Sequence, residues 1–156
     1  MSAFLKNLEI KQLKQSETDT FMAMIEMFYT VFEEEPAIGS KAHLQRMLTD
    51  PRFIAIAAIH EHKVLGGLTA YVLPMYYSDS SEVLLYDMAV RPEHQRMGIG
   101  KALLQQLRQY CQMNGVGDFF VLAHAEDEHA IEFYRSTGGR SEQVVNFVYA
   151  VDEDQP

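Results

Sequence analysis

One stretch of the sequence joins an apolar run directly to a glycine-rich loop and an amphipathic helix. Residues 83–90, VLLYDMAV, are almost entirely apolar and end just before Pro92. A run of this kind predicts a central strand that is buried on both faces. Gly98 and Gly100 follow, and the apolar residues of 98–113 then recur at helical spacing. A buried strand that leads through a short loop into a covering helix requires a layered fold with helices on a sheet.

The other apolar patterns extend this unit into a mixed α/β fold. Alternating or continuous apolar runs predict strands, and apolar residues three or four positions apart predict helices. Beside 83–90, the expected strands are 4–13, 53–59, 64–74, 119–125 and 143–151, and the expected helices are 17–33, a short one after Ser40, 98–113 and another short one after Asp127. No repeat or low-complexity tract interrupts them, so residues 1–156 are expected to form a single domain.

Charge and cysteine content narrow the classes of partner. The net charge is −9, from 22 acidic and 13 basic residues. This balance argues against binding to nucleic acid or to an anionic membrane surface, and it suits a small cationic partner, although an acidic surface also serves solubility alone. Cys111 is the single cysteine, so no disulfide can form within the chain. Because no apolar run is long enough to cross a bilayer and no secretory signal pattern is present, we expect a cytoplasmic protein.

The glycine loop has the composition of an anion site. The first turn of a helix leaves backbone N–H groups without partners and carries a partial positive charge. Gly98 and Gly100 keep side chains away from these groups, and Gln95, Arg96 and Lys101 add donors or positive charge. The spacing matches neither a P-loop nor a dinucleotide fingerprint. We therefore expect a pyrophosphate site of another kind, with a tight turn that binds nothing as the alternative.

Two blocks of the sequence resemble the GNAT superfamily of N-acetyltransferases. Gln95-x-x-Gly98-x-Gly100, preceded by DMAVRPEH, is similar to the acetyl-CoA motif of that superfamily, and AIEFYRSTGG is similar to its later helix with a tyrosine and a terminal glycine. Over residues 50–150 the chain further resembles aminoglycoside 3-N-acetyltransferases of the gentamicin acetyltransferase type. The resemblance implies the GNAT acyl-CoA N-acyltransferase fold, with a mixed, mostly antiparallel sheet flanked by helices. It also implies transfer of acetyl from acetyl-CoA to an aminoglycoside amine, specifically the 3-amino group.

The resemblance also implies which residues hold acetyl-CoA. In this family the backbone amides of the loop and of the helix start bind the CoA pyrophosphate. The matching positions are Gln95, Arg96, Met97, Gly98, Ile99, Gly100 and Lys101. Met88 and Val90 match the strand positions whose backbone pairs with the pantetheine arm. Tyr134 matches the tyrosine that faces the CoA sulfur and can protonate the leaving thiolate, with a core aromatic as the alternative. This chemistry needs no metal.

Carboxylates are the candidates for the acceptor side. The attacking amine must lose a proton, and Asp87 is the first candidate base, because an acidic residue inside an apolar strand is costly without a task or a partner. Pairing of Asp87 with an arginine is the alternative. The candidates for binding a cationic amine are Glu33, Glu34, Glu35, Glu126 and Asp127. A solvated charge run and an acidic helix start are the alternatives for these five.

Other acceptors and a different class of protein stay open at this level. A polyamine, another small amine or a protein amine would serve the same donor chemistry, and a silent acyl-CoA-binding module would use the same loop without turnover. A homodimer is common in the family, and the β-rich C-terminal segment offers an edge for one.

Overall fold

The chain builds one five-stranded sheet, and the computed structural model describes residues 2–152. The strands are β1 (Glu9–Gln12), β2 (Phe53–His60), β3 (Lys63–Pro74), β4 (Ser81–Val90) and β5 (Phe119–Val121). The helices are α1 (Ala3–Lys6), α2 (Thr18–Phe32), α3 (Lys41–Thr49), α4 (Ile99–Met113) and α5 (Glu128–Ser136). Neighbouring strands are antiparallel from β1 to β4, and β5 runs parallel to β4. The predicted mixed, mostly antiparallel sheet is confirmed.

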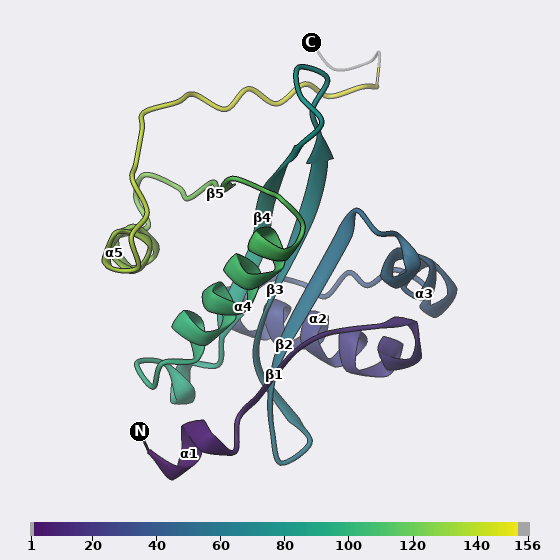
Figure 1. Ribbon diagram of the computed structural model, residues 1–156. Helices are drawn as coiled ribbons and strands as arrows, with labels where there is room; N and C mark the ends of the chain where they lie inside the picture. Colours follow the sequence, from purple (N-terminus) through teal and green to yellow (C-terminus); the bar gives the residue numbers. More distant parts are fainter. Residues whose placement is uncertain (1, 153–156) are drawn as a thin grey trace. The chain divides into compact units, whose positions relative to one another are not determined.

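Helices cover both faces of this sheet. Phe53, Ala55 and Ala57 of β2 belong to the core that packs under α2 and α3. Side chains alternate along a strand, so Ile54 and Ile56 point to the opposite face, where α4 crosses the sheet (Figure 1). Both sets are almost fully buried. Burial on both faces explains why the central strands are continuous apolar runs in the sequence rather than alternating patterns.

Two adjacent glycines of β3 let the helices approach the sheet closely. A Cβ atom on Gly67 would overlap the buried side chain of Met24 in α2. A Cβ atom on Gly66 would lie 3.2 Å from Cγ2 of Ile99, the first residue of α4. Both helices therefore rest on bare backbone at the centre of the sheet.

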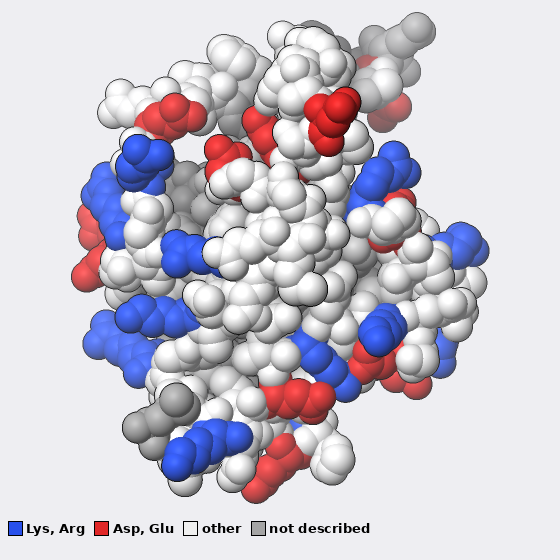
Figure 2. All heavy atoms as spheres, viewed as in Figure 1, with Lys and Arg blue, Asp and Glu red and all other residues white. Residues whose placement is uncertain are grey.

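The described residues fall into two compact units. The first unit runs through Leu122 and contains the sheet with α1 to α4, and the second begins at Ala123 and contains α5. Lys and Arg side chains are spread among Asp and Glu over the visible face (Figure 2). No helix within residues 2–152 is long and apolar enough to cross a membrane.

The predicted short helix after Asp127 and its glycine end are confirmed as α5. The Asp127 carboxylate accepts a hydrogen bond from the N–H of Ala130 (3.1 Å) and caps the helix start. At the other end Gly138 takes a left-handed conformation (φ 100°), and the N–H of Gly139 donates to the carbonyl oxygen of Tyr134 (2.8 Å). This pairing is the hydrogen bond of a Schellman helix end.

Three predicted strands differ from the structure. The region expected as a strand over 4–13 begins as helix α1, because the Ser2 hydroxyl accepts the N–H of Leu5 (3.4 Å), and only β1 is extended. The expected strand 119–125 is shortened to β5. Residues 143–151 were expected to be the final strand, but they belong to no sheet in the described part of the chain. An alternating apolar pattern sets the propensity of a segment, whereas a strand also needs a partner.

Candidate functional site

Strands β4 and β5 separate halfway along β4. The ladder between them joins Val83 to Phe119 and ends where Leu85 pairs with Val121. Beyond this point β4 continues through Val90 with no strand on its β5 side among residues 2–152. Apart from the Val90 carbonyl oxygen, which accepts a hydrogen bond from the Gln95 side chain, the backbone groups on that side of β4 are open to another partner. Met88 and Val90, the positions implied for the pantetheine arm, both lie in this open stretch.

Two side chains of the loop after β4 form hydrogen bonds to the neighbouring strands β3 and β4. The Arg91 guanidinium Nε donates to the carbonyl oxygen of Val64 (2.8 Å), and the Gln95 side-chain amide donates to that of Val90 (3.1 Å). Arg96 has a φ of 61° and Gly98 a φ of 90°, both in the left-handed region. These two left-handed residues turn the chain sharply from the end of β4 into α4.

The start of α4 offers backbone donors together with positive charge. Ala102 is the first residue whose N–H reaches back to Gly98 (3.0 Å), so the N–H groups of Ile99, Gly100 and Lys101 have no helical acceptor. Lys101 and Arg96 are exposed, and neither forms an ion pair within the described residues. Bare glycine backbone, unpaired amides, two cations and the helix dipole fit a pyrophosphate group.

A pocket of about 320 Å³ opens on the face of the sheet covered by α2 and α3. Its aromatic walls come from α2 and from β2, β3 and β4, and two carboxylates and the imidazole of α3 join them. The lining residues are Phe21, Ile25, Phe28, Tyr29, Phe32, Glu34, Ala37, Ile38, Gly39, His43, Leu44, Met47, Phe53, Thr69, Tyr71, Tyr86 and Asp87. Aromatic faces and carboxylates together favour a cation.

A bulge in β4 turns two consecutive side chains toward this pocket. Thr69 of β3 pairs with Asp87, but its neighbour Ala70 pairs with Leu85, so Tyr86 is an extra residue in β4. Consecutive side chains of a regular strand point to opposite faces, and a bulge suspends that rule. Tyr86 and Asp87 therefore both line the pocket. The Tyr86 ring meets the Tyr71 ring edge to face at 5.6 Å.

Asp87 is a half-buried carboxylate without a cationic partner among residues 2–152. Partial burial, and secondarily the negative charge of Glu34, raise the pKa of Asp87 above its usual value. Among the described residues no arginine or lysine forms an ion pair with it, so the alternative of a structural ion pair has no support there. A desolvated carboxylate beside a second one is suited to accept a proton from an amine.

The three glutamates that follow α2 lie in different environments. Glu33 has a φ of 56° and ends the helix, with its N–H donating to the carbonyl oxygen of Thr30 (3.3 Å). The N–H of Glu34 donates to that of Tyr29 (3.1 Å), which completes a Schellman helix end. This turn brings Glu34 to the pocket, whereas Glu33 and Glu35 are exposed outside its lining.

The remaining candidates lie in the second unit. Tyr134 is half-buried in α5, with its ring edge to face against Phe133 at 5.4 Å. The Asp127 carboxylate caps α5, and the carbonyl oxygen of Glu126 accepts the N–H of Glu128 (3.0 Å). The acid-rich helix start therefore accounts for Asp127 by itself.

Sequence reasoning missed most of the aromatic pocket. Tyr71 and Tyr86 are strand residues that a sequence pattern assigns to a buried or a solvent face, and the bulge that redirects Tyr86 has no local signature. His43 lies in the first turn of α3, where its N–H donates a hydrogen bond to the Ser40 hydroxyl (3.2 Å). No sequence motif distinguishes His43 as a pocket residue. Two sequence signals led to the pocket: the negative charge of Asp87 inside an apolar strand, and the acidic run that contains Glu34.

Comparisons with known proteins define the class of this chain. The profile of the Acetyltransferase (GNAT) family matches residues 12–138. The chain belongs to the GNAT family of acetyltransferases, and the predicted GNAT fold is confirmed. The aminoglycoside acetyltransferase meta-AAC0020, from an uncultured soil metagenomic sample and solved in complex with sisomicin, is 37% identical. It superposes with a TM-score of 0.92 over 96% of this chain and 99% of that chain.

A second solved structure is similar over its full length, and a curated enzyme is similar over about half of its length. The aminoglycoside acetyltransferase HMB0005, also from an uncultured soil metagenomic sample, is 32% identical with a TM-score of 0.89 over 97% of this chain and all of that one (100%). The [ribosomal protein bS18]-alanine N-acetyltransferase of Escherichia coli strain K12 is 33% identical over 73 residues. That match spans 47% of this chain and about half (48%) of the curated relative.

Proposed function

We propose that the protein is an acetyl-CoA-dependent N-acetyltransferase whose acceptor is an aminoglycoside amine. One observation carries the proposal: the end of β4 serves two sites at once. Its β5 side is an open backbone edge that leads into the anion site of α4, and its bulged residues Tyr86 and Asp87 line an acidic aromatic pocket. A donor thioester along the edge would meet an amine held in the pocket.

The first unit supplies the donor side of the reaction. The loop and helix-start amides from Arg96 to Lys101 would hold the CoA pyrophosphate, and the Arg96 and Lys101 side chains would add charge. The open edge at Met88 and Val90 would pair with the pantetheine arm, as an added strand does. A backbone N–H of that edge would also stabilise the oxyanion that forms on the thioester carbonyl.

The chemical step needs one group to take a proton and one to give a proton. The amine nitrogen attacks the thioester carbonyl carbon, and the C–S bond breaks as the amide forms. Asp87 accepts the proton that the amine loses, either directly or through a water. Tyr134 gives its phenolic proton to the leaving thiolate, which can accept it because thiols of the cysteine kind have a pKa of about 8.5.

The pocket supports a small polycation as acceptor. Glu34 and Asp87 can hold one ammonium while a neighbouring amine reacts, and the Tyr71 and Tyr86 rings add cation–π attraction. We propose the 3-amino group as the reacting amine, on the sequence resemblance. A protein amine is the second candidate, favoured by the partial similarity to the bS18 alanine acetyltransferase. Glu33, Glu35, Glu126 and Asp127 have weaker support as substrate ligands, because the pocket lining includes none of them.

The proposed working enzyme is a cytoplasmic homodimer of single-domain chains. The family match runs from residue 12 to residue 138, so it crosses the boundary between the two units and supports one domain. A cytoplasmic location would give the enzyme its acetyl-CoA, and it agrees with a chain that has a single, buried cysteine.

A panel of amines tests the proposed function. Thiol release from acetyl-CoA is followed with gentamicin, with spermidine and with a peptide that begins with alanine. We expect turnover with gentamicin and an NMR spectrum of the product with the acetyl group on the 3-amino nitrogen. Acetylation at another nitrogen would refute the regiochemistry alone. Turnover confined to spermidine or to the peptide would refute the antibiotic acceptor, and CoA binding without any turnover would identify a silent module.

A further inference from the structure

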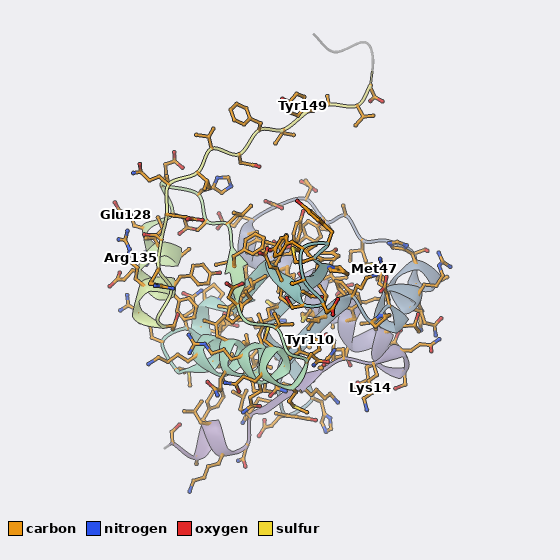
Figure 3. The ribbon with its side chains drawn as sticks, turned by 45° about the horizontal axis from the view of Figure 1, so that its top comes forward. Lys14, Met47, Tyr110, Glu128, Arg135 and Tyr149 are labelled. Atoms are coloured by element: carbon orange, nitrogen blue, oxygen red, sulfur yellow. The ribbon has the colours of Figure 1, made fainter. Side chains whose placement is uncertain are left out.

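The short helix α1 lies against the loop that connects β4 to α4. Both views of the ribbon show α1 beside the start of α4 (Figure 1 and Figure 3). A Cβ atom built on Gly98 would stand 3.7 Å from Cδ1 and 3.8 Å from Cδ2 of Leu5, so the Leu5 methyl groups face the bare side of that glycine. Gly98 is the N-cap of α4. Leu5 therefore lies over the residue after which the unpaired amides of α4 begin.

The ring of Phe4 connects the same loop to the sheet. Its centroid is 4.8 Å from that of His60, the last residue of β2, and 6.0 Å from that of His94, against which it stacks. Both separations are within the range in which aromatic rings attract each other. His94 belongs to the single helical turn with which the loop begins. The helix α1 therefore contacts the loop near its start as well as at its end.

The His94 ring depends on packing rather than on hydrogen bonding at Nδ1. This atom is buried and has no hydrogen-bond partner within residues 2–152. Oε1 of Glu93 is 3.9 Å from it, which is beyond hydrogen-bond reach. A buried polar atom without a partner is costly, so packing contacts have to keep the ring in its place. The Phe4 ring supplies such a contact.

The middle of the loop is strained. Arg96 is not a glycine, and yet it has a φ of 61°, in the left-handed region. A conformation of this kind persists where neighbouring contacts impose it. The α1 contacts at His94 and at Gly98 lie two residues before Arg96 and two residues after it. They are therefore placed to keep the strained turn in its conformation.

We propose that Leu5 and Phe4 are positioning residues for acetyl-CoA. They hold the loop in the shape in which the N–H groups of Ile99, Gly100 and Lys101 can bind the pyrophosphate, and neither residue needs to touch the ligand. The inference rests on the donor site of the proposed function. A loop that is ordered in advance does not have to be ordered on binding, so its ligand binds more tightly. The helix α1 therefore raises the affinity for acetyl-CoA and leaves the chemical step unchanged.

Truncation of Leu5 tests this role, because CoA has a pyrophosphate and pantetheine does not. Leu5→Ala should raise the Kd for CoA, measured by calorimetry, by about three- to ten-fold, and Phe4→Ala should act in the same direction. With gentamicin as acceptor, Leu5→Ala should keep kcat at saturating acetyl-CoA and should keep kcat/KM for acetyl-pantetheine. Leu5→Met restores an apolar contact and should hold the Kd for CoA within about two-fold of the unchanged protein. Asn7→Ala, at an exposed residue that ends α1, is the control and should leave all three quantities unchanged.

Two results would overturn the positioning role and leave the proposed function intact. An unchanged Kd for CoA in Leu5→Ala would mean that the loop keeps its shape without α1. An equal loss of kcat/KM for acetyl-CoA and for acetyl-pantetheine would indicate damage to the whole fold rather than to the pyrophosphate site. A third result separates the two proposals. If the unchanged protein used acetyl-pantetheine as well as acetyl-CoA, the loop would not hold the pyrophosphate, and the donor site would be refuted together with this inference.

Discussion

At the scale of single residues, the raised pKa of Asp87 decides the pH at which it can work as a base. Only the ionised carboxylate accepts a proton from the amine, so activity falls as the pH drops through that pKa. Burial and the Glu34 charge place this fall at a higher pH than for an ordinary carboxyl group. Removal of the Glu34 charge lowers the pKa of Asp87 and extends activity to lower pH.

We therefore predict that Glu34→Gln shifts the acid limb of the kcat/KM profile for the amine toward lower pH. Glu33→Gln is the matched control, because Glu33 caps α2 and lies outside the pocket lining, and it should leave that limb in place. Asp87→Asn should reduce kcat/KM by about 10²-fold at neutral pH and remove the limb. An unshifted limb in Glu34→Gln, with Asp87→Asn still active, would exclude Asp87 as the base.

Protein stability gives Asp87→Asn an independent readout. Because the folded-state pKa of Asp87 is above the unfolded value, the folded state binds more protons between those two values. The stability of the unchanged protein therefore falls as pH rises through that interval, and Asn removes this loss. We expect thermal melts of Asp87→Asn to show an equal or higher Tm at pH 7, so lost activity would not reflect unfolding. A clearly lower Tm would indicate a structural role.

Tyr134 has a test that separates chemistry from packing. Tyr134→Phe keeps the ring that contacts Phe133 and removes only the proton donor. We expect kcat to fall by about 10²-fold with an unchanged Kd for acetyl-CoA, measured by calorimetry. Replacement of acetyl-CoA by a thioester with a more acidic thiol should recover part of the rate, because its thiolate needs less protonation. An unchanged kcat would show that Tyr134 is a core aromatic.

At the scale of elements, the β4–loop–α4 unit could be predicted from the sequence because its signals are local. The apolar run, the two glycines and the helical spacing each act within a few residues, and the structure has β4 and α4 within two residues of the expected bounds. The bulge at Tyr86 could not be predicted, because it depends on the register with β3. The prediction of a strand over 143–151 was wrong for a related reason. An apolar pattern gives the strand propensity of a segment, but it does not show which strand would pair with it. Pocket residues on two helices and three strands share no common sequence signal.

The contact between α2 and β3 gives a prediction for stability. A Cβ on Gly67 would overlap Met24 and lie 3.0 Å from the carbonyl oxygen of Ile56. Gly67→Ala should therefore lower the free energy of unfolding by about 1–3 kcal/mol in urea denaturation. Gly117→Ala is the matched control: no atom lies within 4 Å of its added Cβ, so the change should stay within about 0.5 kcal/mol of the unchanged protein. Equal stabilities would mean that α2 adjusts freely over the sheet.

At the scale of the whole molecule, a net charge of −9 and an acidic pocket would act together on the proposed cationic acceptor. The long-range attraction would raise the local concentration of a polycation, while the proposed donor site has its own positive charge at Arg96 and Lys101. The same negative net charge that argued against nucleic-acid binding would therefore favour binding of the cationic acceptor in the proposed reaction. Attraction of this kind weakens when salt shortens the screening length.

Salt should accordingly raise the KM for a polycationic acceptor. Raising NaCl from about 50 mM to about 500 mM shortens the screening length from roughly 14 Å to 4 Å, and we expect the KM for gentamicin to rise about three- to ten-fold. A monoamine acceptor should change less, because it carries a single charge. Glu34→Gln should weaken the salt dependence, whereas Glu33→Gln alters only the distant field and should keep most of it. A salt-independent KM for gentamicin would mean that shape and hydrogen bonds, rather than the charge of the molecule and its pocket, select the acceptor.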